Sequence, residues 1–356
     1  MSSRLLDNKK LKMLQPAYAL KAILNARKPP FGFSARSLPE AAGWQRRTRP
    51  ALRRLIGFAG LAPAPLSPKL IERVDRGDHV REKILLRTAR DILMPVYILL
   101  PKKSLRPTPV VLAFHGHGYG VKDIVGLWED GGERYSPDGY HKDFAIEICR
   151  RGFAVAAPEI SCFGERRTDF SYLNAAMGQG VPGTCAHTAM LSFHLGGSPI
   201  GLRVHDALRL VDYLETRRDL DASRLGAMGI SGGGLHAFYS TCLDLRIRAC
   251  VISGYFCAFR DSILAMHHCP CNFVPGMWQF GEMADLAGLI APRPMLVESG
   301  DHDGIFPVRS VKKSMHRARE IYNMFGKPGN LAADFFEGRH QISGRKAYDF
   351  LSENLA

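Results

Sequence analysis

Apolar and polar residues alternate in two neighbouring stretches, residues 80–88 (VREKILLRT) and 92–101 (ILMPVYILLP). A period of two is typical of half-buried strands, and the short gap between the stretches predicts an antiparallel pair. Later stretches are more continuously apolar, as in strands buried on both faces. They occupy residues 109–116, 153–159, 224–230, 249–256, 293–299 and 332–338.

Helical periodicity fills the intervals between these strands. The predicted helices cover residues 141–152, 201–217, 233–243, 308–325 and 344–356. Alternating strands and helices predict an α/β fold, with a mostly parallel sheet of about eight strands and helices on both faces. Ligands of such sheets bind beyond the carboxyl ends of the strands. The residues that directly follow each strand are therefore the ones in which to look for chemistry.

The first part of the chain has a different character. A weak basic helix precedes Pro29-Pro30, residues 40–56 predict a second helix, and the Pro-rich stretch 62–68 (APAPLSP) predicts a linker. We therefore expect a basic, partly flexible helical extension over residues 1–66 and a catalytic domain over residues 67–356.

Charge and composition narrow the classes of function. The 356-residue chain has a formal net charge of +14, and residues 1–90 hold 20 Lys and Arg against 6 Asp and Glu. The remainder is neutral, and no nucleic-acid motif accompanies the basic segment, so we expect no nucleic-acid partner. We expect no membrane span either. The eight Cys lie mostly in apolar runs and no signal peptide begins the chain, which favours the cytoplasm.

One serine is surrounded by glycines in the stretch 225–234 (LGAMGISGGG). A predicted strand leads into Ser231 and a predicted helix follows it. Gly229 and Gly233 permit the sharp turn that holds a hydroxyl out above the sheet, as in a G-x-S-x-G nucleophile elbow. Ser231 is therefore the predicted nucleophile.

A serine nucleophile needs a base and an acid that orients the base. His340 follows the last predicted strand and is the predicted base. The loop after the preceding strand reads Gly300-Asp301-His302-Asp303-Gly304. Both carboxylates in that loop qualify as the acid, and Asp303 is preferred because Gly304 gives it room to turn.

Acyl transfer also needs N–H donors for the developing oxyanion. The residue after the nucleophile, Gly232, supplies one backbone N–H. The Gly-rich loop after an earlier strand, 113–120 (AFHGHGYG), supplies the other. We expect it from His117, with Gly118 as the alternative, and interpret the His117 side chain as scaffolding of the loop.

Together the motifs HGHG, GISGGG, GDHDGIFP and GRH resemble the α/β-hydrolase superfamily. Residues 67–356 look like its dienelactone-hydrolase and acetyl-xylan-esterase-like group. That resemblance implies an α/β-hydrolase fold and a serine carboxylesterase for short acyl esters, often acetyl groups on sugars. It also supports Asp303, which stands four residues before Pro307. The sequence departs from classical dienelactone hydrolases, which use Cys where this chain has Ser231, and from glucuronoyl esterases, which carry Arg where it has Gly232.

Two further segments bear on substrate and metal. Residues 166–199 lack strong periodicity and predict a lid or binding surface. Residues 265–276 (AMHHCPCNFVPG) cluster two His and two Cys, but the spacing fits no common zinc motif, so we expect no metal. Phe163, Tyr255 and Trp278 are candidate walls of the substrate pocket.

The predicted mechanism uses no cofactor, and the expected partner is a small-molecule or carbohydrate ester. The sequence leaves a homo-oligomer open. It leaves two other functions open as well: an amidase or peptidase with the same triad, and a catalytically silent hydrolase that serves as a binding protein.

Overall fold

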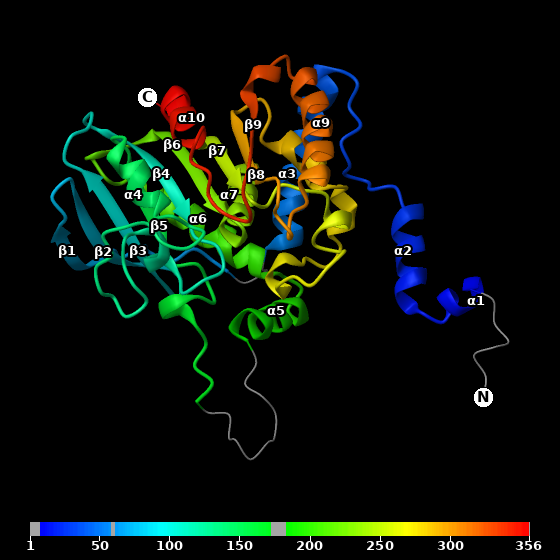
Figure 1. The fold of residues 1–356 in the computed structure, drawn as a ribbon, viewed down its shortest axis with the longest axis horizontal. Coiled ribbons are helices and arrows are strands. Elements are labelled where there is room, and N and C mark those ends of the chain that lie inside the picture. Colours follow the sequence, from blue (N-terminus) through cyan, green and yellow to red (C-terminus); the bar gives the residue numbers. More distant parts are fainter. Residues whose placement is uncertain (1–7, 58–60, 172–182, 356) are drawn as a thin grey trace.

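Nine strands form one mixed sheet at the centre of the protein, in a computed structural model that describes residues 8–57, 61–171 and 183–355. The strand order is β1-β2-β3-β5-β4-β6-β7-β8-β9 (Figure 1). The strands are β1 (Lys69–Asp75), β2 (His79–Ala89), β3 (Ile92–Pro101), β4 (Thr108–Phe114), β5 (Ala154–Pro158), β6 (Leu220–Ile230), β7 (Ile247–Ser253), β8 (Met295–Gly300) and β9 (Leu331–Phe336).

The mode of strand pairing changes once across the sheet, at β5. β1, β2, β3 and β5 pair in antiparallel fashion, whereas the pairs from β5 through β4 to β9 are parallel. All eight predicted strands occur, which confirms the mostly parallel sheet. The ninth, β1, was not predicted because almost all of it is exposed, so its sequence shows no buried face.

Helices cover both faces of the sheet, as predicted. The helices are α1 (Asn8–Met13), α2 (Pro16–Ala26), α3 (Leu38–Ile56), α4 (Phe144–Arg150), α5 (Thr184–His194), α6 (Pro199–Leu214), α7 (Gly232–Leu243), α8 (Met283–Leu286), α9 (Val308–Met324) and α10 (Ala347–Leu355). The larger hydrophobic core lies between the sheet and the layer of α3, α6, α7 and α9. The smaller core lies under α4 and α10 on the opposite face.

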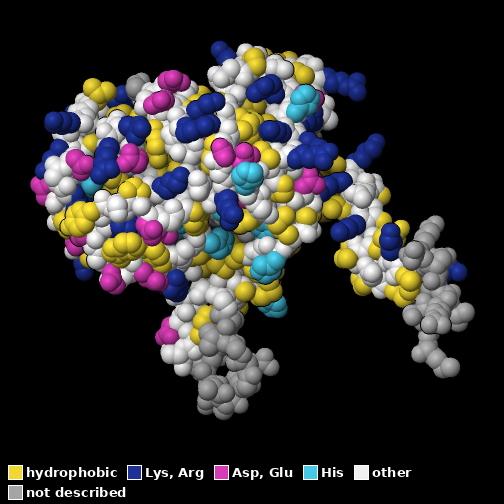
Figure 2. Space-filling model, viewed as in Figure 1, with side chains coloured by type: hydrophobic (Ala, Val, Ile, Leu, Met, Phe, Trp, Pro, Cys, Tyr) yellow, Lys and Arg dark blue, Asp and Glu magenta, His cyan; other side chains and the backbone are white. Residues whose placement is uncertain are grey.

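The N-terminal region contains two kinds of helix. α3 buries Trp44, Leu52 and Ile56 in the larger core. α2 has no buried residue and lies to the side of the molecule, with apolar side chains exposed along it (Figures 1 and 2). Only the later helix of the basic segment is therefore part of the hydrophobic core.

Polar groups of α3 hold it against the C-terminal half of the chain. The Gln45 amide donates to the carbonyl oxygens of Gly288 (2.7 Å) and Ala291 (2.6 Å). The Arg49 guanidinium donates to the carbonyl oxygens of Cys242 (3.0 Å) and Leu289 (2.9 Å). Each of these carbonyls gains a partner that its own helix or turn does not supply.

Among the described residues, no helix combines the length and the apolar character that crossing a membrane requires. The segment predicted as a lid, 166–199, includes α5, while its residues 172–182 lie outside the described part of the chain.

Candidate active site

Ser231 lies in the turn between β6 and α7, directly after the carboxyl end of β6. Its φ of +58° is in the left-handed region, which a non-glycine residue occupies only when its surroundings impose it. The two elbow glycines allow the close approach: a Cβ on Gly229 would collide with the carbonyl of Gly233, and a Cβ on Gly233 with the carbonyl of Phe114. The turn therefore has the geometry that the G-x-S-x-G pattern predicts.

His340 and Asp303 form a hydrogen-bonded pair. His340 Nδ1 lies 2.7 Å from Asp303 Oδ2, and the Asp303 side chain is 1% exposed. The other carboxylate oxygen accepts the backbone N–H groups of Ile305 (2.8 Å) and Phe306 (3.0 Å). Burial alone would raise the pKa of Asp303, but the bond to His340 and these amides outweigh it and hold the pKa below its ordinary value. The carboxylate is therefore ionised and fixed in one orientation.

Asp301, the alternative acid, has a different neighbourhood. It accepts the backbone N–H of Gly338 at 3.0 Å, and its side chain is partly exposed beside His302. Its bond to Gly338 ties the loop after β8 to the loop after β9. The geometry thus gives Asp301 a supporting position and Asp303 the contact with His340.

The second nitrogen of His340 is available for chemistry. Nε2 is buried and has no hydrogen-bond partner among the described residues. The imidazole is stacked between Tyr140 (5.6 Å between ring centroids) and Phe306 (5.8 Å). Ser231 and His340 line the same cavity of about 320 Å³, together with His117, Tyr140, Gly232, Met266, His267, His268, Cys269, Asn272, Ile305 and Phe306.

The predicted oxyanion donors meet beside this cavity. Gly232 begins α7, so its N–H belongs to the first helical turn, where amides have no intrahelical acceptor. A Cβ on Gly232 would lie 3.1 Å from Nδ1 of His117. The hydroxyl of Tyr140 donates to the His117 carbonyl at 2.6 Å, which fixes the peptide of that loop.

Tyr140 and His141 are site residues that the sequence did not indicate. The imidazole of His141 accepts the N–H of Gly116 through Nε2 (2.8 Å) and has Nδ1 3.0 Å from an Asp123 carboxylate oxygen. Burial raises the pKa of Tyr140 and lowers that of His141, although the Asp123 carboxylate opposes the latter shift. Tyr140 directly precedes the helix predicted over 141–152, and His141 was its first predicted residue. The helix begins only at Phe144, so both residues lie in the loop before it.

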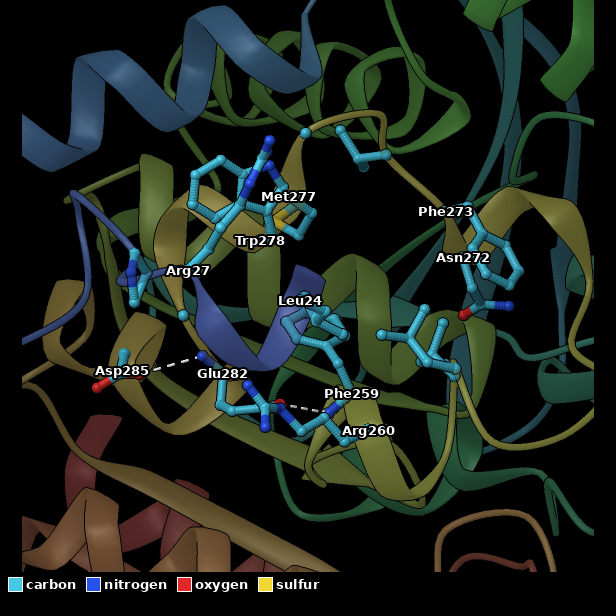
Figure 3. A pocket seen from close by; sticks show the side chains of 16 residues that line it. Leu24, Arg27, Phe259, Arg260, Asn272, Phe273, Met277, Trp278, Glu282 and Asp285 are labelled. Carbon is cyan, nitrogen blue, oxygen red and sulfur yellow. Dashed lines mark hydrogen bonds and ion pairs between the residues drawn. The ribbon is translucent and has the colours of Figure 1, made fainter. Parts of the chain in front are cut away.

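The three residues predicted as pocket walls lie elsewhere. Phe163 is buried with its ring against His115 and His117, and Tyr255 is 1% exposed and packs on Phe306. Trp278 lines a neighbouring cavity of about 470 Å³, with Arg27 over its ring (Figure 3). None of the three is among the described residues that line the Ser231 cavity: Phe163 and Tyr255 pack into the core, and Trp278 faces the other cavity.

One group of described residues has the chemistry of a metal site. The ligand atoms of His117, Cys185, Cys269 and Cys271 all lie within 4.8 Å of one another. The two thiols of the 265–276 segment therefore lie beside His117 and Cys185, which are distant in the sequence. His267 and His268, which are adjacent in the sequence, do not belong to this group. The side chain of His117, expected to serve only as scaffolding of its loop, thus lies among three thiols.

Comparison with known proteins places the chain among hydrolases. The family model described as "Abhydrolase family" (Abhydrolase_7) matches residues 9–355. The protein named "Putative hydrolase YtaP" of Bacillus subtilis is 28% identical over 290 residues, which cover 79% of this chain and 87% of that protein.

Solved structures share the fold at lower identity. A Bacteroides fragilis structure titled "putative acetyl xylan esterase" has a TM-score of 0.74 at 19% identity and covers 95% of this chain and 89% of its own. The glucuronoyl esterase of Solibacter usitatus has a TM-score of 0.65 at 17% identity, with coverage of 89% and 94%.

Proposed function

This chain belongs to the Abhydrolase family of α/β-hydrolases, and from that premise we propose that it is a serine carboxylesterase that cleaves short-chain acyl esters, acetyl esters of carbohydrates among them. One observation carries the proposal. The Asp303-bound His340 has a free Nε2 in the cavity that also holds Ser231.

The proposed reaction begins with proton transfer from Ser231 Oγ to His340 Nε2 as Oγ attacks the ester carbonyl carbon. The backbone N–H groups of Gly232 and His117 hold the oxyanion of the tetrahedral intermediate. His340 then gives its proton to the departing alkoxide, and the alcohol leaves. Water repeats the sequence on the acyl-enzyme, which releases the carboxylic acid and restores Ser231. Asp303 stabilises the imidazolium in both halves.

The size and chemistry of the cavity support a short acyl group. A cavity of about 320 Å³ is at the small end of ligand sites. Gly232 stands where glucuronoyl esterases carry Arg, which favours an acetyl ester over a glucuronoyl ester. The similarity in fold to the Bacteroides fragilis acetyl xylan esterase structure agrees with this substrate class.

The test compares wild type with Ser231→Ala on p-nitrophenyl acetate, butyrate and octanoate, and on acetylated xylo-oligosaccharide. We expect acetate to be hydrolysed fastest and the variant to lose about 10⁴-fold or more in kcat. Ser223→Ala, which changes an exposed serine of the same strand, is the matched control and should retain full activity.

A fluorophosphonate separates the remaining alternatives. It labels an activated serine whatever the leaving group, so labelling at Ser231 without ester turnover would favour an amidase. A folded protein with neither labelling nor turnover would favour a silent, binding hydrolase and contradict the proposal.

A further inference from the structure

Four potential metal ligands converge from three separate segments beside the proposed active site. His117 lies in the loop after β4, Cys185 in the first turn of α5, and Cys269 and Cys271 in the loop after β7. Their ligand atoms lie within 4.8 Å of one another, and Nε2 of His117 is 3.6 Å from Sγ of Cys271. We propose that these four residues bind a zinc ion in a tetrahedral site.

The spacing fits that ion. Zinc bonds to thiolate sulfur at about 2.3 Å and to imidazole nitrogen at about 2.0–2.1 Å, so ligand atoms of a tetrahedral site lie about 3.5–3.8 Å apart. The separation of His117 from Cys271 falls in this interval. Three thiols and one imidazole are donors that select zinc over magnesium or calcium.

A buried arginine supplies a second, independent observation. Arg203 on α6 is 1% exposed, and its Nη2 lies 3.9 Å from Sγ of Cys185. Its Nε and Nη1 have no hydrogen-bond partner among the described residues, and Asp206, one turn along α6, pairs with Arg166 instead. A buried cation is costly without a compensating anion.

A zinc site provides that anion. One Zn²⁺ with three thiolates and a neutral imidazole carries a net charge of −1, which balances the guanidinium of Arg203. A disulfide between two of the thiols would be neutral and would leave Arg203 uncompensated. The charge balance therefore favours the metal over the disulfide.

The site would also orient His117. Coordination through Nε2 places the ring proton on Nδ1, and Nδ1 faces Gly232, one of the two proposed oxyanion donors. This consequence rests on the proposed function, whereas the metal site itself does not. Zinc would also join α5 and the loop after β7 to the oxyanion loop.

Metal analysis of the full chain tests the site. We expect one zinc per chain after purification without chelator, and loss of that zinc in Cys185→Ser and Cys271→Ser. Cys149→Ala, which changes a buried cysteine of α4 on the opposite face of the sheet, is the matched control and should keep the metal. Arg203→Met should weaken zinc binding about 10- to 100-fold, as loss of an outer-shell partner does.

Cobalt substitution of the wild type gives a readout that needs no variant to fold. A tetrahedral site with three thiolates should show thiolate-to-cobalt charge-transfer bands and intense visible d–d bands. Absence of stoichiometric zinc together with absence of these bands would overturn the inference, as would a disulfide among the three cysteines in the natively purified protein.

Activity distinguishes this failure from failure of the proposed function. Ser231→Ala should hold full zinc while it loses hydrolysis. Ester hydrolysis by a chain that binds no zinc would leave the esterase proposal intact and remove the metal site.

Discussion

At the scale of the residue, two aspartates two positions apart in one loop have different partners. Asp303 is buried and bonded to His340, while Asp301 is partly exposed and bonded to a backbone amide. The sequence indicated Ser231, His340 and this loop because each follows a strand of the parallel sheet. It could not exclude Asp301, since which carboxylate turns inward depends on backbone contacts with Ile305 and Phe306.

Exchange of each aspartate for asparagine separates their roles. Asp303→Asn should lower kcat for p-nitrophenyl acetate by about 10³–10⁴-fold, because the amide favours the wrong tautomer of His340 and cannot stabilise the imidazolium. Asp301→Asn keeps an acceptor for the Gly338 N–H and should leave kcat unchanged. Steady-state kinetics at neutral pH measure both effects. An equal loss of kcat in the two variants would contradict the assignment of Asp303 as the acid.

The cysteines show where residue-level reasoning from sequence stops. Cys269 and Cys271 are recognisable as a pair, but their neighbours His117 and Cys185 are distant in the chain. Spacing rules for zinc motifs describe ligands on one short segment, so they do not detect ligands that converge from two loops and a helix.

At the scale of the element, helices and strands with a clear buried face were predictable, and those without one were not. The eight strands with apolar runs were found, whereas the exposed β1 was not. α5 has only two buried residues, Ala189 and Ser192, so the segment that contains it showed no helical stripe. α3 was found because five of its residues are buried at helical spacing, at positions 41, 44, 48, 52 and 56.

Substitution of Trp44 should show how much the packing of α3 contributes to the free energy of unfolding. The side chain is 5% exposed, packs edge-on against Phe33, and donates from Nε1 to the Phe31 carbonyl at 2.9 Å. Trp44→Ala should lower the free energy of unfolding by about 3–5 kcal/mol through the cavity it leaves.

Urea denaturation followed by circular dichroism measures that loss. Trp44→Phe is the control: it keeps most of the packing and loses the hydrogen bond, so it should cost about 1–2 kcal/mol. An unchanged midpoint for Trp44→Ala would show that α3 does not unfold together with the sheet.

At the scale of the whole molecule, two cavities adjoin at the carboxyl end of the sheet. Asn272 lines both the Ser231 cavity and the larger, apolar cavity that contains Trp278. The end of α2, with Leu24 and Arg27, borders the second cavity (Figure 3). The end of α2 therefore lies beside the second cavity, which the distal part of a long substrate bound at Ser231 would reach.

This arrangement predicts a split between small and large substrates. Trp278→Ala should leave kcat/KM for p-nitrophenyl acetate unchanged and raise KM for acetylated xylo-oligosaccharide several-fold, by about 1–2 kcal/mol of lost contact. Kinetics on both substrates check it, with Trp128→Ala, a half-exposed tryptophan outside both cavities, as the control. Equal effects of Trp278→Ala on the two substrates would argue for a change in stability instead.

The anchoring of α3 also has a consequence for biosynthesis. Arg49 donates to the carbonyl of Cys242, a residue 193 positions later. At about 5–20 residues per second, that partner is synthesised roughly 10–40 s after Arg49. Throughout that interval α3 lacks the carbonyl partners of its Gln45 and Arg49 side chains, although Phe33 can already pack against Trp44. The first core helix to be translated thus waits for the second half of the chain before it can dock.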